Sequence, residues 1–307
     1  MALHRLTAVT IGVPNVEEST AYYTEFGLSP DSDGWFETVD GGRQLRVVDA
    51  PTRRLIELEL GADDDDDIGR IAASLNRIGA HADQQPHRVS AVESVTGVRA
   101  TVTVTPRIVQ PTIPATAYNG PGRLERQGLR APGVLRTAPV RPRKLGHAVL
   151  GTTDFEATAG FFIDGLGFKV SDLIKDAGAF LRCSTDHHNV LVLRAPVSFL
   201  HHTSWQVDDV DEVGRGAQAM LEADPRRHVW GLGRHHAGSN FFWYLKDPAG
   251  NFSEYYSDMD CIIDDQLWTP EALEGALGLF NWGPPPPPSF LAPEDLGALM
   301  TGAHSAR

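Results

Sequence analysis

A short pattern near the N-terminus recurs about 139 residues later, and this repeat constrains the fold more than any other feature. Residues 6–12 (LTAVTIG) align without gaps with residues 145–151 (LGHAVLG). Each copy predicts a strand, and a helical pattern follows it. A period of this length is too long for a solenoid and predicts a duplicated domain. At 307 residues the chain is long enough for two such units, each with its own core.

The second copy ends in a predicted hairpin, residues 242–256. Its turn, residues 247–250 (DPAG), joins two runs of aromatic and apolar residues with high strand propensity. On the second strand Phe252, Glu254 and Tyr256 share one face, because side chains alternate along a strand. A carboxylate between two aromatic residues is costly to bury unless a positive group meets it. A metal ion would satisfy this carboxylate.

Two histidines on predicted strands are suited to share a metal ion with Glu254. His147 lies in a short strand, and His202 lies in the strand predicted for residues 199–207 (FLHHTSWQV). Two imidazoles and one carboxylate with open positions form a ligand set typical of non-haem Fe(II). His201 is the competing ligand, but alternation along the strand places it on the opposite face. Alternation therefore allows only one of the two to face the metal ion.

The first copy has the same strand pattern without these ligands. By our alignment, the positions of His147, His202 and Glu254 are occupied there by Ala8, Leu55 and Thr101. Two apolar side chains and a hydroxyl cannot hold a divalent cation. The comparison predicts one metal site per chain, in the second copy. It also shows that the repeated fold does not itself require histidines at these positions.

These residues resemble the vicinal oxygen chelate superfamily (glyoxalase, bleomycin resistance protein and dioxygenase), and within it the type I extradiol ring-cleavage dioxygenases. The resemblance covers roughly residues 144–262 as motifs and the N-terminal third as pattern only. It implies an α+β fold with two tandem vicinal oxygen chelate domains. Each domain would be built of paired βαβββ modules, whose mixed sheets form half-barrels around one metal.

The resemblance implies a complete site. Its metal ligands would be His147, His202 and Glu254, binding Fe(II), with Mn(II) as the alternative. Its catalytic groups would be His188, His235 and Tyr244. By the same resemblance, His188 handles dioxygen and protons, while His235 and Tyr244 hydrogen-bond the substrate. The implied reaction is extradiol (meta) cleavage of a catechol by dioxygen, in the degradation of aromatic compounds.

Two of these assignments have a neighbouring alternative. The segment from His188 to Leu193 resembles the family's strand in which histidine precedes apolar residues, which favours His188, but variation in loop length leaves His187 open. For the other pair, the Arg-His motif of the family selects His235, and His236 is expected at the surface.

Composition and motifs together predict four segments of the chain. We expect a ligand-free domain over residues 1–108, a linker rich in Pro and Arg over 109–143, a catalytic domain over 144–265 and a Pro-rich tail over 266–307. Apolar residues flank the five prolines of the tail, so it should pack near the mouth of the catalytic pocket.

The net charge of −13 argues against nucleic acid or an anionic membrane as a partner. The start of the chain has no apolar signal segment, and two cysteines make no disulfide framework, so we expect a cytoplasmic protein. The expected partners are a catecholic substrate, dioxygen and further copies of the chain.

Two rival functions use the same residues. A glyoxalase-like metal-dependent lyase or isomerase would normally draw ligands from both halves of the chain. A non-catalytic protein that binds aromatic compounds would not need His188, His235 and Tyr244 together.

Overall fold

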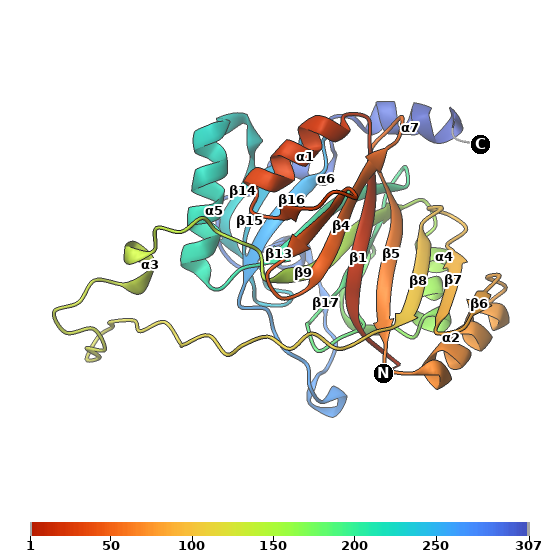
Figure 1. The fold of residues 1–307 in the computed structure, drawn as a ribbon, viewed down its shortest axis with the longest axis horizontal. Helices are drawn as coiled ribbons and strands as arrows, with labels where there is room; N and C mark the ends of the chain where they lie inside the picture. The colour runs from red at the N-terminus through yellow and green to blue at the C-terminus, as the bar shows by residue number, and fades with distance from the viewer. Residues whose placement is uncertain (1, 306–307) are drawn as a thin grey trace.

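The computed structural model describes residues 2–305 and contains two mixed β-sheets (Figure 1). The first sheet has the strand order β2-β3-β4-β1-β5-β8-β7-β6. Its elements are β1(Leu3–Val13), α1(Val16–Glu25), β2(Ser29–Pro30), β3(Trp35–Thr38), β4(Gly42–Asp49), β5(Arg54–Ala62), α2(Asp65–Arg77), β6(Asp83–Gln85), β7(Arg88–Val92) and β8(Arg99–Val104).

The second sheet has the strand order β14-β15-β16-β13-β9-β12-β11-β10-β17. Its elements are β9(Lys144–Thr152), α4(Phe155–Gly160) with the π-helical turn Phe161–Gly165, β10(Lys169–Ile174), β11(Gly178–Arg182), β12(Val190–Arg194), β13(Phe199–Gln206), α5(Val210–Ala223), β14(His228–Arg234), β15(Phe241–Lys246), β16(Phe252–Ser257) and β17(Ala272–Leu273). The remaining helices are α3(Pro132–Leu135), α6(Pro288–Leu291) and α7(Leu296–Ser305), with short 3-10 turns at Pro225–Arg227, Asp265–Leu267 and Gly275–Gly278.

Both sheets are assembled by the same rule from two βαβββ modules. The first strands of the two modules pair antiparallel at the centre, β1 with β5 and β9 with β13. Each first strand also pairs in parallel with the last strand of its own module, as β13 does with β16 and β5 with β8. The predicted α+β fold of paired βαβββ modules is therefore confirmed.

Aspartates begin several of the helices. The side chain of Asp64 caps α2 by accepting a hydrogen bond from the backbone N–H of Asp67 at 2.9 Å, and Asp209 caps α5 in the same way. Further aspartates in the first turn of α2 favour the positive end of the helix dipole. Five consecutive aspartates, Asp63 to Asp67, thus lie at the start of α2.

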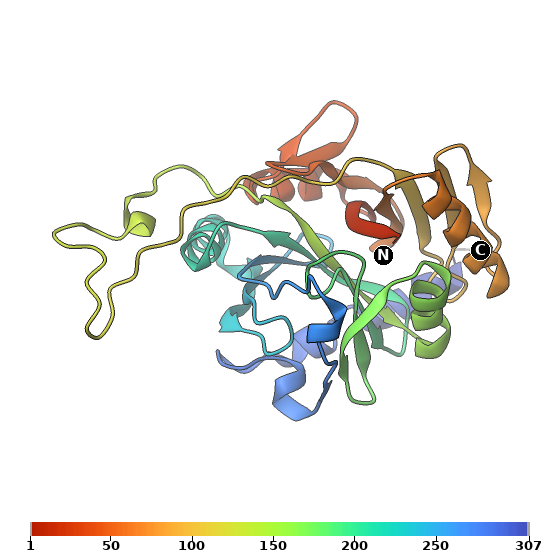
Figure 2. The ribbon, with the colours of Figure 1, turned by 90° about the horizontal axis from the view of Figure 1, so that it is seen from below.

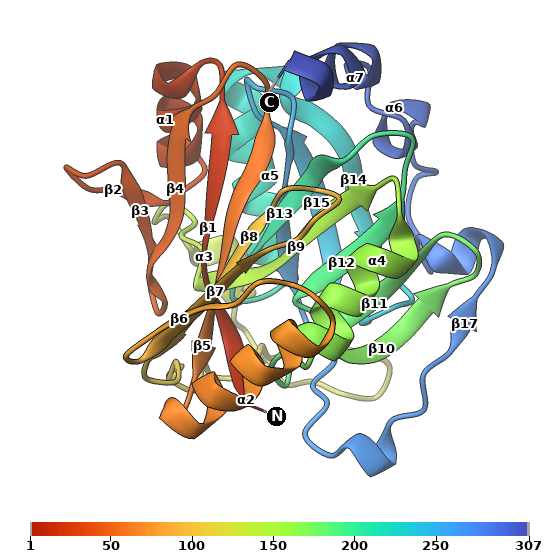
Figure 3. The ribbon, with the colours of Figure 1, turned by 90° about the vertical axis from the view of Figure 1, so that its right-hand side faces the viewer.

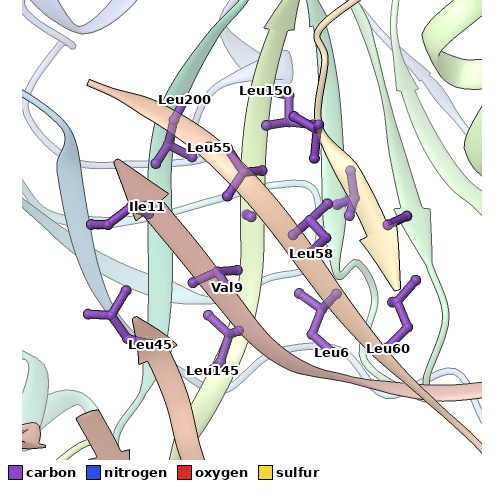
Figure 4. Close-up of a cluster of buried hydrophobic side chains, with 14 of the residues drawn as sticks. Leu6, Val9, Ile11, Leu45, Leu55, Leu58, Leu60, Leu145, Leu150 and Leu200 are labelled. Atoms are coloured by element: carbon purple, nitrogen blue, oxygen red, sulfur yellow. The ribbon is translucent and has the colours of Figure 1, made fainter. Parts of the chain in front are cut away.

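One hydrophobic core joins the two sheets. Buried side chains of β1 and β5 belong to the same cluster as those of β9 and β13, and Figure 4 shows Leu55 of β5 among them together with Leu145, Leu150 and Leu200. Figure 3 shows the two sheets beside each other, with α2 next to α4. The core lies between the sheets, so the site must lie on the far side of the second sheet.

The strand pairing corrects our alignment of the two copies. His202 pairs with Val149 on β9, and the residue in the same relation on the first sheet is Glu57, which pairs with Thr10. Leu55 instead corresponds to Leu200, and both are buried core residues. The alignment was wrong by two residues there, because alternation along a strand makes a shift of two invisible to the apolar pattern.

The corrected alignment places one potential metal ligand, a carboxylate, among the three counterpart positions of the first sheet. Ala8, Glu57 and Thr101 now hold the three positions, and the Thr101 hydroxyl donates a hydrogen bond to the Glu57 carboxylate. One carboxylate remains without an imidazole beside it in the part of the chain described. The expectation of a single three-ligand set per chain, formed by His147, His202 and Glu254, therefore stands, and only the counterpart of His202 in the first sheet changes.

Two irregular segments complete the chain. Residues 106–131 form no helix and leave the body as a long loop (Figures 1 and 2), with α3 at its return. The C-terminal segment runs along the second sheet to α6 and α7 (Figure 3). Arg53 anchors it, since its guanidinium donates to Asp295 at 2.6 Å and to the Leu200 carbonyl at 2.6 Å.

No helix in the described part of the chain is both long enough and apolar enough to span a membrane.

Candidate metal centre

Three neighbouring strands bring the predicted ligands together. His147 lies on β9, His202 on β13 and Glu254 on β16, and these strands are adjacent in the order β16-β13-β9. Ser204 is paired with His147 on one side and with Glu254 on the other. The register of the sheet, which the hydrophobic pattern of the strands specifies, therefore sets the spacing of the ligands.

The donor atoms of these residues form a small triangle. His147 Nε2 lies 3.3 Å from His202 Nε2 and 3.0 Å from Glu254 Oε2, and His202 Nε2 lies 3.7 Å from Glu254 Oε2. The circle through these atoms has a radius of about 2 Å, so an ion just above its plane would lie about 2.1 Å from all three, an ordinary metal–ligand distance. In the part of the chain described, this is the one such group of three.

The Glu254 carboxylate supports the fit to a metal ion. Its side chain is fully buried, and Oε2 has no partner with hydrogen-bonding geometry among the described residues. Oε1 accepts a hydrogen bond from Asn240 Nδ2 at 3.2 Å. A buried carboxylate oxygen without a partner is costly, and a cation held also by two imidazoles would remove that cost.

Electrostatics keep this carboxylate ionised. Burial by itself would raise the pKa of Glu254, but the close approach of His147 and His235 outweighs burial and holds the pKa below its usual value. For His202, burial is the largest cause and lowers the pKa well below that of a free imidazole. An ionised carboxylate and neutral imidazoles are the forms that bind metals.

His201 departs from our expectation. A β-bulge lies between Leu200 and His202 in the pairing with β9, and it breaks the alternation of side chains. His201 is consequently buried against the same cavity as His202 instead of on the opposite face. Its Nδ1 lies 2.7 Å from His202 Nδ1, and its Nε2 lies 2.7 Å from the Phe290 carbonyl oxygen. Both ring nitrogens of His201 are thus engaged away from the triangle of donor atoms.

The three predicted catalytic groups surround the triangle. The ring of His188 lies 4.2 Å from that of His147, centroid to centroid, and lines the same cavity. Tyr244 is directly opposite Glu254 in the β15–β16 hairpin. Its hydroxyl lies 2.9 Å from His235 Nε2. Burial is the main cause that raises the pKa of Tyr244 well above its usual value, and the Glu254 charge adds to it.

The neighbouring alternatives lie elsewhere. His187 is buried behind His188 and does not line the cavity; its Nε2 is 3.0 Å from Asp172 Oδ2. His236 is exposed and lies near Glu271 at the surface.

Sequence reasoning missed three contributors. Asn240 holds Glu254, Asp172 holds His187, and the Leu279 carbonyl accepts a hydrogen bond from His235 Nδ1. A lone Asn, a lone Asp and a backbone carbonyl have no motif that could have revealed them.

An apolar cavity of about 250 Å³ opens onto the triangle. Aliphatic and aromatic side chains make up most of its wall, and Phe290 and Leu291 of the tail form part of it. Phe290 stacks on Phe252 with a ring separation of 5.7 Å. The expected packing of the tail near the pocket is therefore confirmed.

Comparison with known proteins places these features in context. Residues 144–255 match the model of the Glyoxalase/Bleomycin resistance protein/Dioxygenase superfamily. The chain is 38% identical over 180 residues to metapyrocatechase 2 of Cupriavidus necator, covering 56% of this chain and 55% of that protein. It is 30% identical over 139 residues to an iron-dependent extradiol dioxygenase of Rhodococcus jostii, covering 40% and 46%. The chain thus spans about half the length of these curated relatives.

A solved structure is similar over nearly the whole chain. The Mn(II)-bound glyoxalase from Novosphingobium aromaticivorans superimposes with a TM-score of 0.74 and 26% sequence identity, covering 93% of each chain. The likeness therefore extends beyond the matched segment to both sheets.

Proposed function

We propose, on the premise that residues 144–255 are a domain of the glyoxalase/bleomycin resistance protein/dioxygenase superfamily, that this protein is an extradiol catechol dioxygenase. The observation that carries the proposal is the gathering of His188, His235 and Tyr244 around the three donor atoms at one end of an apolar cavity. We further propose that the two sheets correspond to the tandem domains 1–108 and 144–265.

His147, His202 and Glu254 would hold Fe(II), and their number leaves positions free for other ligands. A ferrous ion there would supply a binding point shared by substrate and dioxygen, and a positive charge that lowers the pKa of a bound phenol. Mn(II) accepts the same oxygen and nitrogen donors and is the alternative ion.

The protein's own groups orient and protect the substrate. Because the Leu279 carbonyl accepts the N–H of His235 Nδ1, His235 Nε2 is left to accept the Tyr244 hydroxyl. This fixed pair can hydrogen-bond a catechol oxygen in one orientation. His188 faces the cavity beside His147, where it can hold or move a proton. The apolar wall excludes water and strengthens these polar contacts.

The wall of the cavity also favours one class of catechol. Arg194 is the single Arg or Lys among its described lining residues, and its guanidinium already pairs with Glu156 and stacks over Phe155. A carboxylate on the substrate would therefore be buried without a positive partner, which is costly. We propose that the substrate carries an uncharged apolar substituent, alkyl or aryl.

This preference can be measured and shifted. For catechols of similar size, kcat/KM should be at least about tenfold higher for the alkyl or aryl compound than for the carboxylated one. Leu291 lines the cavity yet is 59% exposed, so Leu291→Arg would add a cation without burying it. That variant should reduce the ratio by up to about fivefold, the scale of an exposed ion pair. A native preference for the carboxylated catechol would contradict this substrate class.

The reaction itself is tested by a spectrophotometric screen. Fe(II)-loaded protein mixed aerobically with substituted catechols should form the yellow ring-opened semialdehyde or keto acid. The same protein should not isomerise the hemithioacetal of methylglyoxal and glutathione, the reaction of a glyoxalase. Isomerisation without any yellow product would favour the glyoxalase reading, and binding without either reaction would favour a sequestering protein.

A further inference from the structure

Two pairs of adjacent histidines meet the cavity in the same arrangement. We name two of these residues inner histidines: His202, whose Nε2 belongs to the donor triangle, and His188, which lines the cavity beside His147. His201 also lines the cavity but contributes no atom to the donor triangle. The other ring of each pair contacts the inner ring through Nδ1, and we name these outer histidines: His201 and His187. All four rings are buried. A neutral imidazole carries one proton, on one of its two nitrogens.

The contacts of His201 determine where its proton lies. His201 Nε2 is 2.7 Å from the Phe290 carbonyl oxygen, which can only accept a hydrogen bond, so His201 carries its proton on Nε2. His201 Nδ1 is then an acceptor, and it lies 2.7 Å from His202 Nδ1. His202 must carry its proton on Nδ1, which leaves the lone pair of Nε2 directed at the donor triangle.

In the second pair, the contact of His187 with a carboxylate determines where its proton lies. His187 Nε2 is 3.0 Å from Asp172 Oδ2, and the other oxygen of Asp172 accepts the backbone N–H of Glu271 at 2.8 Å. With Asp172 Oδ2 as the acceptor, the proton of a neutral His187 lies on Nε2, and His187 Nδ1 is then an acceptor. His188 Nδ1, 3.0 Å away, is the donor, and its Nε2 carries no proton.

We propose that the outer histidines His201 and His187 are positioning residues that fix the ring tautomer of their inner neighbours. His201 thereby presents His202 Nε2 as a metal ligand, and the carbonyl of Phe290 makes the C-terminal tail part of this support. His187 presents an unprotonated His188 Nε2 to the cavity. The catalytic consequence of the second arm rests on the proposed dioxygenase function, whereas the tautomers themselves do not.

The contact at Nδ1 of an inner histidine determines whether its Nε2 is free of a proton. Without an acceptor at Nδ1, an inner imidazole could carry its proton on Nε2, where it would block a metal ion or occupy the acceptor that faces substrate. Supporting groups of this kind typically alter metal affinity or activity by about 10- to 100-fold.

Matched substitutions separate this role from packing. Asparagine places its amide oxygen close to the position of imidazole Nδ1 and can still accept the hydrogen bond, whereas leucine of nearly the same size cannot. We therefore compare His201→Asn with His201→Leu and His187→Asn with His187→Leu in the full chain. Thermal melting of each variant checks that it is folded.

The first arm is measured with Zn²⁺ as a redox-inert probe, by competition with a chelating dye. His201→Leu should weaken Zn²⁺ binding by about 10- to 100-fold, and His201→Asn should restore it to within a few-fold of the native protein. Equal affinities in the native protein and His201→Leu would overturn this arm, and so would equal losses in the Leu and Asn variants.

The second arm is measured by ¹⁵N NMR of histidine rings in the Zn²⁺-loaded chain, together with kcat. His188 should carry its proton on Nδ1 in the native protein and in His187→Asn, and a second tautomer should appear in His187→Leu. For the iron-loaded enzyme, His187→Leu should lower kcat by about tenfold or more with unchanged Zn²⁺ affinity. Finding the His188 proton on Nε2 in the native protein would overturn this arm.

These readouts stand apart from the proposed reaction. If no catechol is cleaved, the dioxygenase assignment fails while Zn²⁺ affinity and ring tautomers still test the role of the outer histidines. If catechols are cleaved but the Leu and Asn variants behave alike, the dioxygenase assignment stands and the proposed role of the outer histidines fails.

Discussion

Replacing Glu254 by alanine should reduce bound iron from about one per chain to near zero and abolish ring cleavage. The carboxylate is fully buried, and its Oε2 lies 3.0 Å from His147 Nε2. Removing it leaves two imidazoles, too few donors to retain a labile ferrous ion. Elemental analysis after anaerobic loading and desalting measures the iron directly.

Thr101→Ala is the matched control, because Thr101 holds the position of Glu254 in the first sheet. Its hydroxyl contacts the Glu57 carboxylate and no imidazole, so this variant should keep its iron. If iron survives in Glu254→Ala but is lost in Thr101→Ala, the metal site lies in the first sheet and our assignment is wrong.

Replacing His188 by glutamine should leave iron binding nearly intact while lowering kcat by ~10² or more, the usual scale for a lost acid–base group. His188 lines the cavity but contributes no atom to the donor triangle, so metal binding and turnover should separate. Iron analysis and steady-state kinetics on the same preparation check both quantities.

Substitutions of two other histidines serve as controls for this prediction. His236 is exposed and outside the cavity, so His236→Gln should leave kcat unchanged. His187→Gln acts only through its neighbour and should reduce kcat less than His188→Gln does. A loss of turnover in the His187 variant alone would show that the choice between the two residues is wrong.

Only part of the topology could be predicted from the residues themselves. The repeat of residues 6–12 at residues 145–151 predicted a duplicated domain, whereas the βαβββ modules were implied by the family resemblance, and both sheets have them. The hairpin itself was predicted from its turn and its aromatic strands, and the structure pairs Tyr244 with Glu254 across it. The repeat and the turn each involve a few residues that are close in sequence, so they can be recognised without a structure.

The bulges were not predictable in the same way. A bulge at His201 brings it to the side of His202, and the first sheet has an equivalent bulge at Ile56. A bulge adds one residue without changing composition, so the period-two pattern on either side still reads as a regular strand. Our error at His201 comes from this cause, whereas the error at Leu55 was a shift of two residues, which leaves the alternation of apolar residues unchanged.

Long-range support was also invisible in the sequence. The Phe290 carbonyl reaches His201 from 89 residues away, and Asp172 reaches His187 across 15 residues. Neither partner has a recognisable spacing, because the fold alone brings them to the rings. Such groups belong to the site as much as the residues that motifs identify.

The central claim is that one site, formed by His147, His202 and Glu254, cleaves catechols with dioxygen. Anaerobic titration of the metal-free protein with Fe(II), followed by oxygen-electrode measurement with a saturating apolar catechol, tests it most directly. Oxygen uptake should rise linearly and level off at about one iron per chain, with about one O₂ consumed per catechol cleaved. No uptake at any loading, or a plateau near two irons per chain, would contradict the account.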